Sequence, residues 1–189
     1  NKRDAFLFKM YQAFGHHFDF IAIPIIKKHL RMDTSQVIIN EERPQLTKHL
    51  ATRFKEKIGQ NVNLLGEVVL GNEEADHRYH HYLEALESPD INYISVKISG
   101  IYAQTHALNY EESFPELVSR MSALYQKAID FPYTDEDGIK RSKFINLDME
   151  EYKDAHFTLR LFKAVLNLPQ FKNYSAGIVV QAYLPDAYD

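Results

Sequence analysis

The feature that most constrains the fold of this chain is an alternation of short apolar runs with longer segments of helical periodicity. Four runs are predicted to be strands: Asn61–Leu65, Tyr93–Lys97, Phe144–Asp148 and Ile178–Tyr183. Each of the first three is followed by a segment whose apolar residues recur every three or four positions, as on one face of a helix. Strands joined through helices form right-handed crossovers and a parallel sheet. The pattern therefore predicts an α/β fold.

The three helices are predicted from their ends and their apolar faces. The first is expected to start at Asn72 as its N-cap, with two glutamates in the first turn, and to stop at Ser88-Pro89. The predicted buried faces are Ala75, Tyr79, Tyr82, Leu83 and Leu86 in the first helix, Phe114, Leu117, Val118, Met121, Leu124, Tyr125 and Ala128 in the second, and Tyr152, Ala155, Leu159, Phe162 and Leu166 in the third.

The four strand-helix units suggest half of a closed barrel. Residues 1–60 are predicted to be mainly helical, with helices over Phe6–Phe14 and Leu46–Ile58. Residues 61–189 hold four units, whereas a complete (βα)8 barrel has eight and about 250 residues. We therefore expect two parts, a helical segment over 1–60 and a partial (βα)8 barrel over 61–189. The latter contains the first four β/α units and is truncated before the barrel closes.

Composition excludes several classes of function. The net charge is −4 over 189 residues, which argues against a nucleic-acid partner, because nucleic acids need a concentrated basic surface. The chain has no cysteine, so disulfides, thiolate metal sites and cysteine nucleophiles are excluded. No apolar run reaches the roughly 20 residues that span a bilayer. The lack of cysteine also fits a reducing compartment.

Polar residues at the ends of the predicted strands form the candidate site. The first strand is followed by Glu67, the second ends at Lys97, the third ends at Asp148, and the fourth contains Gln181. Ligands of parallel α/β folds bind at the carboxyl ends of the strands. A cation, two carboxylates and an amide would converge there, which suits a small zwitterionic or anionic substrate.

Each of these residues also has a purely structural alternative. Lys97 could extend its ammonium from a strand end into solvent. Asp148 could be the N-cap of the following helix, with Glu151 completing a capping box. Gln181 could pair with neighbouring backbone groups, and Glu67 could be an ordinary solvated loop residue. Residue types and spacing leave these alternatives open.

The amino-acid sequences at the strands resemble those of a known family. Four motifs occur in the order and spacing found in proline dehydrogenases, and they look most similar to the proline dehydrogenase domain of the bifunctional bacterial proline-utilisation enzymes. The motifs are Val62–Glu67, Ser95–Ser99, Phe144–Glu151 and Val180–Pro185, and the resemblance covers about residues 46–187. Any one motif is weak, but four in order at strand ends are specific.

The resemblance implies a distorted (βα)8 barrel with FAD at its mouth. Such enzymes oxidise L-proline to Δ1-pyrroline-5-carboxylate by hydride transfer to FAD and pass the electrons to a quinone. By this resemblance Lys97 helps to hold the substrate carboxylate, and Asp148 positions charged groups in the active site. Gln181 contacts the flavin, and Glu67 pairs with a substrate-binding arginine to gate the site.

The resemblance also implies partners and a location. The remaining half of the barrel, and a pyrroline-5-carboxylate (glutamate semialdehyde) dehydrogenase domain, are expected in the full-length chain. The family's arginine pair for the proline carboxylate would lie beyond residue 189, so the fragment alone is expected to be inactive. The full-length enzyme is expected to be cytoplasmic and peripheral to the inner membrane.

Two other functions compete with this interpretation. Lys97 could be a Schiff-base nucleophile in another barrel enzyme that acts on a small carboxylate, or the chain could be a non-catalytic scaffold fragment.

His77, His80 and His81 have a helical spacing that can bind zinc, but they are expected on the outer, solvated side of a helix, so no metal site is predicted. Residues 131–142 are expected to form an exposed insertion with a turn at Asp135–Gly138.

Overall fold

The computed structural model describes residues 6, 9, 20, 23–34, 38–39, 43–64, 71–103 and 109–188. The chain divides into two compact units, Asn1–His49 and Leu50–Asp189. The first contains a helix over residues 23–34. Helix α2 (Arg43–Lys55) confirms the helix predicted over Leu46–Ile58, although it begins and ends three residues earlier. No helix in the described part of the chain is long and apolar enough to cross a membrane.

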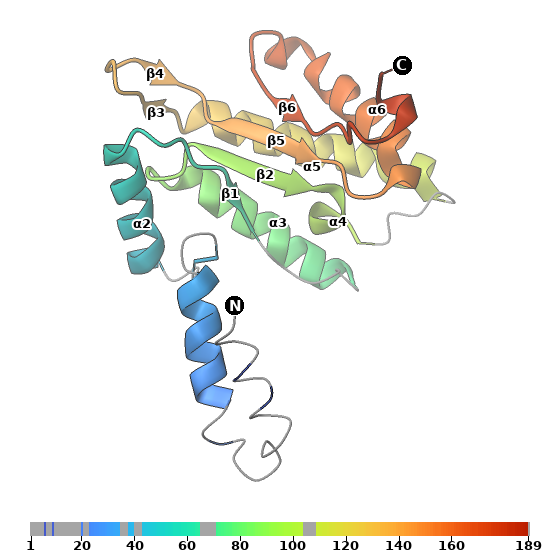
Figure 1. The fold of residues 1–189 in the computed structure, drawn as a ribbon. Coiled ribbons are helices and arrows are strands. Elements are labelled where there is room, and N and C mark those ends of the chain that lie inside the picture. Colours follow the sequence, from blue (N-terminus) through green and yellow to red (C-terminus); the bar gives the residue numbers. More distant parts are fainter. Residues whose placement is uncertain are drawn as a thin grey trace. The chain divides into compact units, whose positions relative to one another are not determined.

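The second unit is built on a parallel four-stranded sheet in the order β1-β2-β5-β6 (Figure 1). The strands are β1 (Val62–Asn63), β2 (Tyr93–Lys97), β5 (Phe144–Asp148) and β6 (Gly177–Ile178). The bounds of β2 and β5 are those predicted from the sequence. The parallel α/β architecture is thus confirmed, and β1 is shorter than the predicted run.

One face of the sheet is apolar and covered by helices. Ile94, Val96, Ile145 and Leu147 alternate along β2 and β5 and are completely buried. Helices α3 (Asn72–Glu87) and α5 (Tyr110–Asp130) lie along this side of the sheet (Figure 1). Successive residues of a strand point to opposite faces, so the intervening residues form the other face.

That other face carries polar side chains in rows across the sheet. The strand register aligns Asn63 with Ser95 and Ser95 with Asn146, and Gly177 completes the row on β6. Both Ser95 and Asn146 are buried. Asn61, just before β1, donates its amide hydrogen to the Ser95 hydroxyl over 2.8 Å. The sheet therefore offers a polar surface that runs towards its carboxyl edge.

The fourth strand differs from its prediction. Ile178–Tyr183 was expected to be extended throughout, but β6 covers only Gly177–Ile178. The amide of Val179 still donates to the carbonyl oxygen of Leu147 over 2.9 Å. Ile178 pairs with Leu147, and β5 ends at the next residue, Asp148. The residues after Val179 therefore have no adjacent strand to pair with among the described residues.

Helices α3 and α5 confirm the predicted periodicity, whereas the predicted cap of α3 is wrong. Gly71 occupies the N-cap position in an extended conformation, and its carbonyl oxygen accepts a hydrogen bond from the amide of Ala75 over 3.1 Å. Asn72 is therefore the first residue of the helix. Helix α3 ends at Glu87, with the predicted Ser88 as its C-cap, and α5 buries Leu117 and other members of its predicted face.

The third helix turns a different face to the core from the one predicted. Helix α6 (Ala155–Leu166) buries Phe157, Thr158, Leu161 and Val165, whereas Leu159 is 36% exposed. The reason is tertiary. The ring of Phe157 stacks on Tyr110 of α5 with 4.1 Å between centroids, and this contact sets the rotation of the helix. Tyr152 lies in a separate 3-10 turn, η2 (Tyr152–Asp154), and is exposed.

Arg120 of α5 joins three elements on the helical side. Its guanidinium lies 2.6 Å from an oxygen of Asp76 on α3 and 2.8 Å from an oxygen of Glu116. A third N–H donates over 2.8 Å to the carbonyl oxygen of Ile101, the last residue of α4 (Ile98–Ile101). The side chain is largely buried. Arg120 thereby ties α3, α4 and α5 together.

The expected insertion between α5 and β5 is present and forms a short hairpin around the predicted turn. Strands β3 (Tyr133–Thr134) and β4 (Lys140–Arg141) pair antiparallel. The carboxylate of Asp135 accepts hydrogen bonds from two backbone amides of the turn and from Arg141, whose hydrogen bond lowers the pKa of the aspartate. Gly138 adopts a φ of +78°, the left-handed conformation that favours glycine.

Candidate functional site

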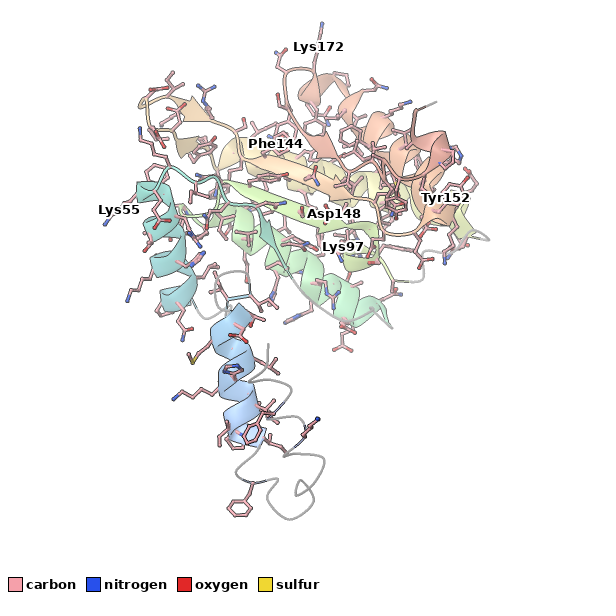
Figure 2. All side chains as sticks on the ribbon, in the orientation of Figure 1. Lys55, Lys97, Phe144, Asp148, Tyr152 and Lys172 are labelled. Atoms are coloured by element: carbon pink, nitrogen blue, oxygen red, sulfur yellow. The ribbon has the colours of Figure 1, made fainter. Side chains whose placement is uncertain are left out.

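Two predicted site residues, Lys97 and Asp148, lie side by side at the carboxyl edge of the sheet (Figure 2). They are the last residues of β2 and β5, and the strand register makes them direct partners. Because residues opposite each other in a parallel pair point to the same face, both side chains belong to the polar face. Glu67, the third predicted residue, lies outside the described residues.

The Asp148 carboxylate is held by two amides rather than used as a helix cap. Asn146 donates to one oxygen over 2.9 Å, and Asn63 of β1 donates to the other over 3.5 Å. Helix α6 begins at Ala155 and has Asp154 at its N-cap position. The capping alternative for Asp148 is therefore wrong, and the carboxylate stays at the open end of the strands.

Glu150 connects Lys97 with Gln181. One carboxylate oxygen of Glu150 lies 3.7 Å from the Lys97 ammonium, and the backbone oxygen of Glu150 accepts a hydrogen bond from the Gln181 amide over 3.3 Å. Gln181 thus pairs with a backbone group, as its purely structural alternative predicts. It nevertheless lies at the same edge of the sheet as Lys97, because both contact Glu150. Sequence reasoning did not single out Glu150. Its position two residues after Asp148 was the signal that could have identified it.

Tyr82 of α3 supports the end of β2 from the helical side. Its ring is buried, and a backbone hydrogen bond links its hydroxyl to Lys97. Burial raises the pKa of Tyr82 to about 12, and the hydrogen bond with Lys97 opposes that rise. A Cβ atom on Gly100 would lie 3.1 Å from the hydroxyl, so the glycine leaves room for it. Tyr82 therefore stays neutral and braces the strand that carries Lys97.

The site combines opposite charges with an apolar margin. The Lys97 ammonium lies 3.7 Å from a carboxylate oxygen of Glu150, Asp148 is the register partner of Lys97 on β5, and the Lys97 side chain is 36% exposed. Next to Gln181, Val180 and Tyr183 are 55% and 79% exposed. Such a site can pair with both charges of a zwitterion, while the amide and its apolar neighbours can lie against a flat, partly polar ring.

The histidines of α3 are arranged differently from a metal centre. The rings of His77 and His81 lie 4.3 Å apart between centroids, and a ring nitrogen of His80 lies 2.6 Å from the backbone oxygen of Asp76. Across the described residues, no group of three or more histidine, cysteine, aspartate or glutamate side chains has the geometry to hold a metal ion.

Comparison with known proteins identifies a family and several solved structures that this chain resembles. The family described as proline dehydrogenase matches residues 46–189. Proline utilization A (PutA) of Corynebacterium freiburgense superposes with a TM-score of 0.74 at 38% identity, over 85% of this chain and 16% of that one. PutA of Bdellovibrio bacteriovorus, solved after inactivation by N-propargylglycine, gives a TM-score of 0.76 at 29% identity, over 90% of this chain and 19% of the other. A search of curated proteins gave no match.

These matches define what the chain is related to and how much of it is present. PutA of Bradyrhizobium japonicum, in a D779Y variant, matches with a TM-score of 0.57 at 25% identity, over 67% of this chain and 13% of that one. The chain thus spans less than a fifth of the length of these solved relatives. The family match covers more than half of the chain and includes the strand ends that carry Lys97 and Asp148. The chain belongs to the proline dehydrogenase family.

Proposed function

We propose that the carboxyl edge of this sheet is part of the active site of an enzyme that oxidises L-proline to Δ1-pyrroline-5-carboxylate. The observation that carries the proposal is the pairing of Lys97 with Asp148 on adjacent strand ends, in a chain of the proline dehydrogenase family. The parallel sheet is proposed to be the first half of a (βα)8 barrel over residues 61–189. Further chain would supply the remaining strands and the second half of the substrate site.

Lys97 and the two carboxylates, Asp148 and Glu150, interact with the oppositely charged groups of the substrate. The Lys97 ammonium donates charge-assisted hydrogen bonds to the proline carboxylate. Asp148, which both asparagines hold in place, orients the charged groups around it. Glu150 is the counter-ion of Lys97 when substrate is absent, and the substrate carboxylate competes with it for the ammonium. A fixed arrangement of this kind contributes to catalysis by orienting the reacting ring.

The described residues fit the flavin that the family uses. Gln181 presents an amide that both donates and accepts, and exposed Val180 and Tyr183 flank it, as a flat ring with a polar edge requires. FAD, when bound, would supply the chemistry by accepting the hydride from the proline ring. Gln181 would contact the flavin edge, and Glu67 is proposed as the gate of the substrate site. Electrons would pass on to a quinone at the membrane surface.

The wider setting is proposed from the resemblance to the bifunctional proline-utilisation enzymes. We place the protein in the cytoplasm, peripheral to the inner membrane, with a pyrroline-5-carboxylate dehydrogenase domain elsewhere in the full-length chain. The helical segment 1–60 is assigned as a separate N-terminal part. Residues 1–189 alone are proposed to be inactive, and this purified chain, mixed with FAD and then desalted, should emerge colourless. A yellow product that proline bleaches would contradict this.

The Schiff-base alternative is less consistent with the surroundings of Lys97. A lysine nucleophile is activated by desolvation or by a neighbouring cation. Lys97 instead has an anionic neighbour, Glu150, at 3.7 Å and a side chain that is 36% exposed. Borohydride reduction in the presence of a carbonyl substrate should therefore leave no covalent adduct on Lys97, as mass spectrometry of the peptide would show.

Substitution of the paired residues in the intact enzyme tests the proposal. Lys97→Met should raise KM for proline by about tenfold to a hundredfold, because one charge-assisted hydrogen bond to the carboxylate is lost. Asp148→Asn should lower kcat with a smaller effect on KM. Lys172→Met is the matched control, since Lys172 is exposed and lies at the far side of the unit (Figure 2). Normal kinetics for both Lys97→Met and Asp148→Asn would contradict the proposal.

A further inference from the structure

A buried asparagine and a glycine lie directly beneath Asp148. Asn146 sits in the middle of β5, is only 9% exposed, and donates its amide hydrogen to an Asp148 oxygen over 2.9 Å. Its partner on the neighbouring strand is Gly177 of β6. The strand therefore approaches the asparagine at a position that has no side chain.

Gly177 is required by space rather than by backbone conformation. Among the described glycines only Gly138 has a positive φ, so alanine could adopt the backbone of Gly177. A Cβ atom there, however, would lie 2.6 Å from the Asn146 amide oxygen and 3.0 Å from two carbons of the Phe144 ring. The Phe144 ring is itself packed edge-on against Tyr93, with 5.0 Å between centroids. An alanine at this position would therefore require at least one of these two side chains to shift.

The hydrogen bond to the carboxylate determines which end of the asparagine amide faces Asp148. The amide oxygen lies against Gly177, so the NH2 group is directed along the strand to the carboxylate. A rotated amide would place its oxygen against a carboxylate oxygen, and neither is a donor. A buried amide is favourable only when it is hydrogen-bonded, so the native orientation is strongly preferred.

We propose that Gly177 and Asn146 are positioning residues for Asp148. Gly177, which has no side chain, leaves room for the Asn146 amide, and this amide holds the Asp148 carboxylate in the orientation that catalysis requires. The inference rests on the proposed function for the role of Asp148. It adds two residues that do not themselves reach the substrate. Asn63 of β1, on the other side of β2, donates to the second oxygen over 3.5 Å and adds a further support.

A double-mutant cycle in the intact enzyme tests the contact. Gly177→Ala should lower Tm by about 5 °C, because the added methyl group has no room. It should also lower kcat/KM for proline by about tenfold. Gly59→Ala is the matched control, since a Cβ on Gly59 meets nothing within 4 Å, and it should change neither value. In an Asn146→Ala background, Gly177→Ala should cost clearly less Tm than in the native protein. Equal costs in the two backgrounds would overturn the contact.

An isosteric variant separates positioning from packing. Asn146→Asp keeps the size of the side chain but replaces the NH2 donor with an oxygen next to Asp148. We expect kcat/KM to fall by about a hundredfold, mainly through kcat, and the crystal structure to show the Asp148 carboxylate turned away. Asn146→Asp also remains informative if Gly177→Ala does not fold.

The outcomes distinguish this inference from the proposed function. If Asp148→Asn leaves proline oxidation intact, the role of Asp148 in the proposed function fails. If Asp148→Asn abolishes activity, but Asn146→Asp and Gly177→Ala both keep kcat/KM within about twofold of the native value, the positioning inference fails and the proposed function stands.

Discussion

Replacing Lys143 with methionine should change the pH dependence of stability in a predictable direction. Lys143 immediately precedes β5 and is only 1% exposed. Its ammonium donates a hydrogen bond to the backbone oxygen of Ser88, at the end of α3. Burial lowers the pKa of Lys143 from 10.5 to about 8, and Asp90 partly opposes this shift. The lysine is therefore charged at pH 7 in a place that disfavours charge.

The magnitude and the sign follow from this shift. The unfolded chain holds the Lys143 proton up to about pH 10.5, and the folded chain releases it near pH 8. Between these values the unfolded state binds more protons, so stability rises with pH. The shift corresponds to a cost of about 3 kcal/mol that is fully present below pH 8 and is lost as the pH approaches 10.5.

Lys143→Met removes this cost but also the hydrogen bond to Ser88, which is worth about 1.5 to 3 kcal/mol. At pH 7 the two terms nearly cancel, and we expect the variant to be as stable as the native protein within about 1 kcal/mol. At pH 10 the native protein should gain about 2 to 3 kcal/mol relative to the variant, because only the native protein has lost the buried charge.

Urea unfolding of the native and Lys143→Met proteins at pH 7, 8, 9 and 10 measures the difference directly. Using the difference cancels the titration of all groups that the two proteins share. Lys172→Met, which removes an exposed lysine, should run parallel to the native protein. A native-minus-variant difference that stays constant from pH 7 to pH 10 would refute the reasoning.

Three further predictions concern contacts between elements. Arg120→Lys should lower the free energy of unfolding by about 2 kcal/mol, because lysine cannot serve α3, α4 and α5 at once, and urea unfolding would measure it. Tyr110→Phe removes the hydroxyl that donates to Asp154 and should lower the free energy of unfolding by about 1 kcal/mol in the same assay. No change would mean that α5 and α6 pack through their aromatic rings alone. Glu150→Gln frees the Lys97 ammonium from its counter-ion and should lower KM for proline by about threefold in steady-state kinetics, while a raised KM would assign Glu150 to substrate binding.

Elements whose pattern is local were predictable from the chain itself. The bounds of β2 and β5 follow from short apolar runs that end in a charged residue, and the structure has the same bounds. Helices α3 and α5 follow from apolar residues at three- and four-residue spacing. Since parallel strands bring their carboxyl ends to one edge, the proximity of Lys97 and Asp148 could also be predicted once the strands were placed.

Features that depend on a neighbour in space were not predictable in the same way. The face of α6 that is buried depends on the stacking of Phe157 on Tyr110, which lies 47 positions earlier in the numbering. The early end of β6 depends on where β5 stops. Hydrophobic periodicity reports whether a residue is inside or outside, but it carries no information on which element it meets.

The fold class, the principal strands and helices, and the family could be inferred from the chain alone, because they depend on short-range periodicity and on motifs at strand ends. The support of the site became visible only in the folded protein: Glu150 lies between Lys97 and Gln181, and the Asn146 amide oxygen lies against Gly177. The physical reason is that hydrogen-bond partners and close contacts are set by strand register and packing, which join residues that are distant in the chain.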